Sequence, residues 1–137
     1  MAQALAANVH GGETIELSSD LGGGKTTFTR FFGQALGAKD DISSPSFTVQ
    51  NIYRLDEGEL HHFDFYRLDD AGIVAGSLEE SIYESDILTV IEWANIVEGV
   101  LPVDTLRIAI RSNGGESRLY EFTATPENSY LLEGLSL

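Results

Sequence analysis

Residues 15–36, IELSSDLGGGKTTFTRFFGQAL, constrain the fold more than any other stretch of the chain. The alternating run TIELS (14–18) predicts a short strand, and the apolar spacing after the glycines predicts a helix with its stop at Gly37. Glycines between a strand and a helix let backbone N–H groups surround a phosphate, and the helix N-terminus adds partial positive charge. The stretch therefore predicts a phosphate-binding loop rather than a plain glycine turn that happens to carry a lysine.

The end of this loop carries the residues expected to contact a nucleotide. Lys25 follows Gly24 and is placed to reach the β and γ phosphates, and the hydroxyl of Thr26 is placed to bind Mg²⁺. Ser19 stands where the motif usually opens with glycine. A positive φ at a serine would cost about 1–2 kcal/mol.

The rest of the pattern predicts one α/β domain over residues 1–137 with few helices. SFTVQNIYRL and ELHHFDFYRL read as a strand hairpin, ILTVI (87–91) as a central strand buried on both faces, and TLRIAIRS with SRLYEFTA as a C-terminal hairpin. In the helix after the glycines, the expected core stripe is Phe28, Phe31, Phe32, Ala35 and Leu36. The weakly patterned acidic segment 69–85 predicts a loop with a short helix, and 126–137 a loosely packed tail. The fold class is a P-loop NTPase with a mixed parallel and antiparallel sheet.

Charge and composition exclude several functions. Eight Lys and Arg against 22 Asp and Glu give a formal net charge of −14, which predicts no direct grip on tRNA and no membrane contact. The absence of cysteine excludes disulfides and thiolate metal sites. No apolar run is long enough to span a bilayer and the N-terminus does not resemble a secretory signal, so we expect a cytoplasmic protein.

Two acidic residues follow predicted strands and could serve the metal ion or the attacking water. Glu92 comes directly after ILTVI, and Asp64 follows the strand HHF. A P-loop enzyme needs a carboxylate at the carboxyl end of a neighbouring strand; which of the two orients the water stays open. His61 and His62 point to opposite faces of a strand, which disfavours a joint metal site and favours a packed or edge role. The single tryptophan, Trp93, reads as a core or rim aromatic.

Several of these segments together resemble the TsaE family, the bacterial P-loop ATPases of the tRNA threonylcarbamoyladenosine pathway. DLGGGKTTFTRFFGQALG, SSPSFTVQNIY, HHFDFYRL, IEW and the following LP occur in the family's order and spacing, over about residues 5–120. The resemblance implies a Mg²⁺-dependent ATPase, weak alone, that acts with the proteins TsaB and TsaD to modify the adenosine beside the tRNA anticodon. It implies a switch-like loop at 44–47. The implied ATP-binding residues are Leu21, Gly22, Gly23, Gly24, Lys25, Thr26, Thr27 and Arg118. The implied catalytic set is Lys25, Asp64 and Glu92, with Thr26 and Glu92 at the metal.

Two other functions remain open at this level. A nucleotide-dependent regulatory module without useful hydrolysis would show the same motif. A small-molecule kinase would need several arginines to clamp donor and acceptor phosphates, and this chain offers few.

Overall fold

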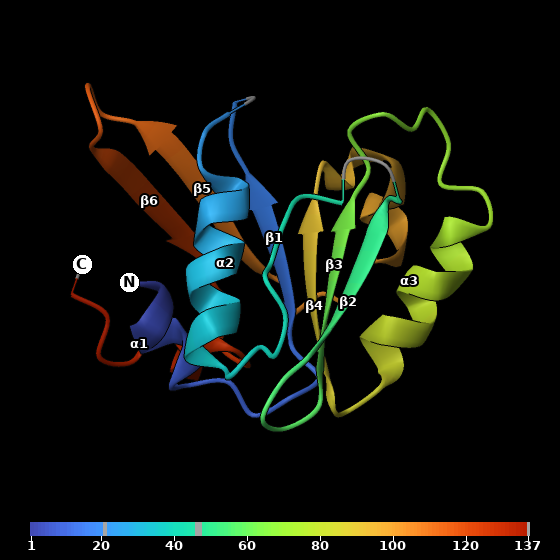
Figure 1. Cartoon of the computed structure of the whole chain (residues 1–137), viewed down its shortest axis with the longest axis horizontal. Helices are drawn as coiled ribbons and strands as arrows, with labels where there is room; N and C mark the ends of the chain where they lie inside the picture. Colours follow the sequence, from blue (N-terminus) through green and yellow to red (C-terminus); the bar gives the residue numbers. More distant parts are fainter. Residues whose placement is uncertain (21, 46–47, 137) are drawn as a thin grey trace.

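A computed structural model describes residues 1–20, 22–45 and 48–136 and contains one six-stranded sheet in the order β2-β3-β4-β1-β5-β6 (Figure 1). The four inner strands are parallel, while β2 and β6 pair antiparallel at the two edges. The mixed sheet and the C-terminal hairpin are as predicted. The helices are α1 Ala2–Ala6, α2 Lys25–Ala35 and α3 Val74–Tyr83, with 3-10 helices η1 Ala94–Val100 and η2 Ser129–Leu132. The strands are β1 Thr14–Ser18, β2 Gln50–Arg54, β3 Glu59–Asp64, β4 Ile87–Glu92, β5 Leu106–Ser112 and β6 Arg118–Thr123.

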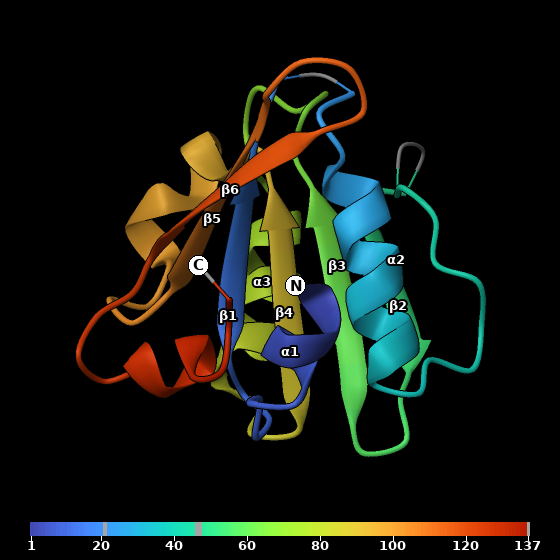
Figure 2. The same cartoon turned by 90° about the vertical axis from the view of Figure 1, so that its left-hand side faces the viewer.

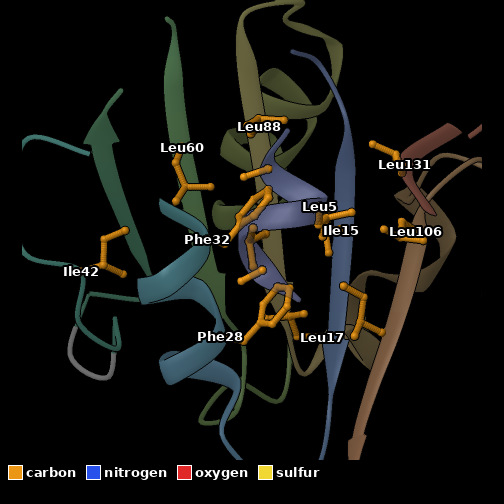
Figure 3. Close-up of a cluster of buried hydrophobic side chains, with 14 of the residues drawn as sticks. Leu5, Ile15, Leu17, Phe28, Phe32, Ile42, Leu60, Leu88, Leu106 and Leu131 are labelled. Atoms are coloured by element: carbon orange, nitrogen blue, oxygen red, sulfur yellow. The ribbon is translucent and has the colours of Figure 1, made fainter. Parts of the chain in front are cut away.

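Helices cover both faces of the sheet, which explains the continuous apolar run in β4. Helices α1 and α2 lie on one face and α3 on the other (Figure 2). On the α2 face, Phe28 and Phe32 pack toward Ile15, Leu17 and neighbouring aliphatic side chains (Figure 3). On the other face, a second buried cluster forms around Phe63, Ile91 and Leu78. Strand β4 therefore contributes side chains to both clusters, as predicted for a central strand.

The predicted stripe on α2 is wrong at Phe31 and Ala35. Phe31 is 54% exposed, and Ala35 is exposed as well. The buried face instead includes Thr29, whose hydroxyl donates to the Lys25 carbonyl at 3.0 Å, and Gly33. A Cβ at Gly33 would lie 2.0 Å from a methyl carbon of Ile42. The helix turns this bare backbone toward the core because only glycine allows so close an approach, and Phe31 rotates outward as a result.

The prediction of a loosely packed tail over 126–137 is wrong for the residues that the structure describes there. Leu131 is 1% exposed and belongs to the α2-face core. The side-chain amide of Asn8 donates to the carbonyls of Leu131 at 3.0 Å and Glu133 at 2.7 Å. These contacts join the two ends of the chain, so no local sequence pattern could indicate them.

The β2–β3 turn allows a first prediction about stability. Gly58 has φ +75°, and a Cβ there would lie 2.0 Å from the backbone oxygen of Asp86. Positive φ costs an L-residue about 1–2 kcal/mol, and backbone must also move, so Gly58→Ala is expected to lower the free energy of unfolding by at least ~2 kcal/mol. Urea unfolding checks this result.

The matched control is Gly76→Ala, at an exposed position in the first turn of α3. No heavy atom lies within 4 Å of a Cβ built at Gly76. Alanine is expected to raise stability there by about 0.5–1 kcal/mol through helix propensity. Equal effects of the two substitutions would contradict the predicted strain at Gly58.

Within the described part of the chain, no helix combines the length and the apolar character needed to cross a bilayer.

Candidate nucleotide-binding site

A cavity of about 390 Å³ lies where β1, β3 and β4 reach their carboxyl ends. Residues 22–27 of the glycine loop and of the α2 N-terminus line one side of it, and Asp64, Glu92 and Trp93 line another. Open α/β sheets bind ligands at this edge because loops there leave a crevice between helix N-termini and strand ends. The cavity therefore stands at the position that the glycine loop predicts.

The glycine loop has the backbone that a phosphate cradle requires. Gly22 has φ +74° and Gly24 has φ +104°, and beside both there is open space where a Cβ would stand. A Cβ at Gly23 would lie 2.4 Å from the Ser19 hydroxyl oxygen. All three positions therefore demand glycine, and the space at the α2 N-terminus fits a phosphate group. Leu21, also predicted to bind nucleotide, lies outside the described residues.

Ser19 replaces the opening glycine without the strain that a positive φ would bring. Among the described residues other than glycine, only Val49 and Trp93 have positive φ. The Ser19 hydroxyl oxygen accepts a hydrogen bond from Lys25 Nζ at 2.8 Å. The serine thus adds a hydrogen-bond acceptor for the Lys25 ammonium group.

Lys25 is buried and held at several points. Its side-chain nitrogen also lies 3.5 Å from the carbonyl oxygens of Ser19 and Asp20, and 4.8 Å from the centre of the Trp93 ring. Trp93 adopts a left-handed backbone, φ 57°, and packs against Tyr66 at 4.8 Å between ring centres. The tryptophan is therefore part of the cavity wall, where its ring contacts the ammonium group.

The structure places Asp64 and Glu92 in the same cavity as Lys25 and Thr26. The two acidic residues are register partners at the ends of β3 and β4. Glu92 is 3% exposed and accepts from His62 Nε2 at 2.9 Å. Asp64 is half-buried, and its Oδ1 accepts from the Tyr66 amide at 2.9 Å.

Burial raises the pKa of Asp64 above its ordinary value of 3.8. The Tyr66 amide opposes this shift, and so do the nearby His62 and Lys25, while the charge of Glu92 reinforces it. An aspartate that holds its proton more tightly than usual is a better proton acceptor once it has ionised.

This donor set fits Mg²⁺ only together with a nucleotide. In the described part of the chain, no three His, Cys, Asp or Glu residues cluster closely enough to bind a metal ion alone. Mg²⁺ is usually held by one or two carboxylates plus substrate phosphates and waters. Thr26, Asp64 and Glu92, all lining the cavity, match that requirement.

Comparison with known sequences decides the family. The family profile described as "Threonylcarbamoyl adenosine biosynthesis protein TsaE" matches residues 1–120. This chain belongs to the TsaE family. A Bacillus subtilis (strain 168) protein named tRNA threonylcarbamoyladenosine biosynthesis protein TsaE is 37% identical over 124 residues, which are 90% of this chain and 77% of that protein. A TsaE protein of Streptomyces coelicolor is 34% identical over 115 residues, covering 82% of this chain and 78% of its own.

The fold agrees with that membership. The crystal structure of Bacillus subtilis YdiB superposes with a TM-score of 0.76 at 33% identity, covering 96% of this chain and 82% of that one. The TsaE resemblance and the P-loop fold class predicted from sequence are thereby confirmed.

Arg118, which the TsaE resemblance implied as a nucleotide contact, does not line the cavity. It is exposed at the start of β6, two strands away from β1, and its guanidinium donates to the carbonyls of Gly115 at 3.1 Å and Ser117 at 3.0 Å. Arg67 lines the cavity instead. Arg67 lies three residues after Asp64, just beyond the end of β3, and this position in the sequence could have predicted that it lines the site.

One residue that contacts the cavity wall, His62, was undervalued by the sequence interpretation. His61 and His62 do face opposite sides of β3, but both are buried, and His62 contacts Glu92. Its position two residues before Asp64 on a strand was the signal, because alternate residues share a face. Ser44 of the predicted switch-like loop lines the cavity, while residues 46–47 lie outside the described part, so the switch stays a prediction.

Proposed function

We propose that this chain is the ATP-binding and ATP-hydrolysing subunit that acts with TsaB and TsaD in threonylcarbamoylation of the tRNA adenosine next to the anticodon. The observation that carries the proposal is the convergence of the glycine loop, Lys25 and two carboxylates in one cavity. The names of the relatives support the pathway. Membership of a family named for a tRNA-modification pathway supports action in the cytoplasm.

Phosphate binding falls to Lys25 and the backbone amides of the glycine loop. Lys25 exchanges its contacts with Ser19 for the β and γ phosphates, and the α2 N-terminus adds its dipole. Thr26 and Glu92 hold Mg²⁺, which neutralises charge on the phosphates when bound.

Asp64 orients the attacking water. Its carboxylate lines the cavity, its Oδ1 is fixed by the Tyr66 amide, and burial raises its pKa. These features suit a group that accepts a proton as the water attacks in line. Glu92, with one oxygen already bonded to His62, is better suited to hold the metal ion.

This chain contacts protein partners rather than tRNA. Its net charge of −14 repels a phosphate backbone, so tRNA must be bound elsewhere in the assembly. We assign that task to TsaB and TsaD.

A regulatory module that binds ATP without useful hydrolysis is the second candidate. The observation in its favour is the engagement of Lys25 by Ser19 and the Trp93 ring, which nucleotide must displace. A kinase is disfavoured because Arg67 is the only arginine among the described residues that line the cavity.

The deciding experiment measures MgATP hydrolysis by the chain alone and with a purified TsaB–TsaD pair. We expect weak turnover alone, stimulation by the pair, and loss of the stimulated rate in the Glu92→Ala variant. Binding without hydrolysis in both settings would support the regulatory module. Stimulation that persists in the variant would remove Glu92 from the mechanism.

A further inference from the structure

His62 is a fully buried histidine whose only described hydrogen bond is to Glu92. It is 0% exposed, and its Nε2 lies 2.9 Å from Glu92 Oε1. It stands two residues before Asp64 on β3, so the two side chains share the face of the sheet covered by α2. Glu92 is the register partner of Asp64 on β4 and points to that same face.

The hydrogen bonding of the two ring nitrogens indicates which of them carries the proton. His62 Nδ1 is buried and has no hydrogen-bond partner among the residues that the structure describes. An ionised carboxylate only accepts hydrogen bonds, so the proton on the bonded side belongs to Nε2. The imidazole is therefore a donor aimed at one carboxylate oxygen.

We propose that His62 is a positioning residue that holds the Glu92 carboxylate so that Oε2 faces the cavity and is available to a Mg²⁺–nucleotide complex. The inference rests on the proposed function, because it assigns Glu92 to the metal. Buried side chains behind a metal ligand fix its orientation, and their loss typically costs about 10- to 100-fold in metal affinity or activity.

His61 supplies a matched control on the same strand. It is 7% exposed and faces α3, where its ring bonds to Ser81 at 2.6 Å and Glu59 at 2.7 Å. It is not among the described residues that line the cavity. Substituting either histidine removes a buried imidazole from β3, yet only one of the two touches Glu92.

The test compares nucleotide affinity with Mg²⁺ and with EDTA by calorimetry, using ADP as the probe. In the His62→Leu variant we expect the Mg²⁺-dependent part of the affinity to fall about 10- to 100-fold, with affinity in EDTA unchanged. His62→Gln, which keeps an N–H donor, is expected to recover most of the loss. His61→Leu is expected to keep the Mg²⁺ dependence of the wild-type chain.

A double-mutant cycle separates positioning from general packing. Leucine at 62 leaves the buried Glu92 charge unpaired, which destabilises the fold, so thermal unfolding is recorded for every variant. In a Glu92→Gln background, which removes that charge, His62→Leu is expected to cause no further loss of Mg²⁺ dependence. Turnover should show a KM for MgATP that rises together with the loss of Mg²⁺-dependent affinity.

Three outcomes would overturn the inference. The first is a His62→Leu variant with wild-type Mg²⁺ dependence, and the second is an equal loss in His61→Leu. The third is additive losses in the double-mutant cycle. If the wild-type chain itself showed no Mg²⁺-dependent binding, the proposed function would fail first and the inference with it, which is distinguishable from the other three.

Discussion

The Lys25→Ala variant is expected to bind ATP at least about 100-fold more weakly than the wild-type chain. A hydrogen bond to a charged group contributes about 1.5–3 kcal/mol, and the upper end of that range corresponds to about 100-fold in affinity. The cavity also holds the carboxylates Asp64 and Glu92, which repel phosphates once the ammonium group is gone. Fluorescence of Trp93 provides the measurement, because its ring lies against Lys25 and is the only indole in the chain.

The chain contains one other lysine, which provides the control. Lys39 lies beyond the C-terminal end of α2, is mostly exposed, and pairs with Asp56. Surface ion pairs contribute about 0–1 kcal/mol, so Lys39→Ala is expected to leave ATP binding intact. Wild-type affinity in Lys25→Ala, with its folding verified by circular dichroism, would remove the lysine from the phosphate site.

The features of the fold that sequence predicts well are those set by neighbouring residues. The strand–glycine–helix unit, the two hairpins and the buried strand ILTVI each carry their own periodicity and turn residues, and the structure confirms all of them. The location of Asp64 and Glu92 follows from the same logic, since parallel strands end at one edge of a sheet. Local pattern therefore fixes which loops and carboxylates meet.

The features that it misses depend on contacts between distant parts of the chain. Phe31 is exposed because Gly33 packs against Ile42, and no pattern within α2 reveals that neighbour. Arg118 falls outside the cavity because β6 lies at the sheet edge, a fact of strand order rather than of spacing. His62 acquires its role only when Glu92, thirty residues later, is placed beside it.

Replacing Asp64 with asparagine is expected to abolish most turnover while making the fold more stable at neutral pH. A general base contributes about 10²- to 10⁴-fold to rate, so hydrolysis with TsaB and TsaD should fall by at least the lower figure. The asparagine oxygen can still accept the Tyr66 amide that Asp64 accepts at 2.9 Å, so the loop after β3 is retained. ATP binding is therefore expected to survive.

The stability gain follows from the direction of the pKa shift. Burial raises the pKa of Asp64 above its ordinary value of 3.8, so the folded chain binds this proton more tightly than the unfolded chain. Its contribution to stability is complete below 3.8 and is lost as the pH rises through the raised pKa. An asparagine does not titrate, so Asp64→Asn should exceed the wild type in thermal unfolding at pH 7. The difference should shrink as the pH falls toward 4.

Asp104→Asn is the control, because it makes the same chemical change at the opposite end of the strands, just before β5 begins. Asp104 is exposed and does not line the cavity, so turnover should not change. Full turnover in Asp64→Asn would indicate that Glu92, rather than Asp64, orients the attacking water. An unchanged thermal stability would contradict the claim that burial raises the pKa of Asp64. The two effects of Asp64→Asn have opposite signs, because the half-buried carboxylate that we propose accepts the proton is the same charge that weakens the fold.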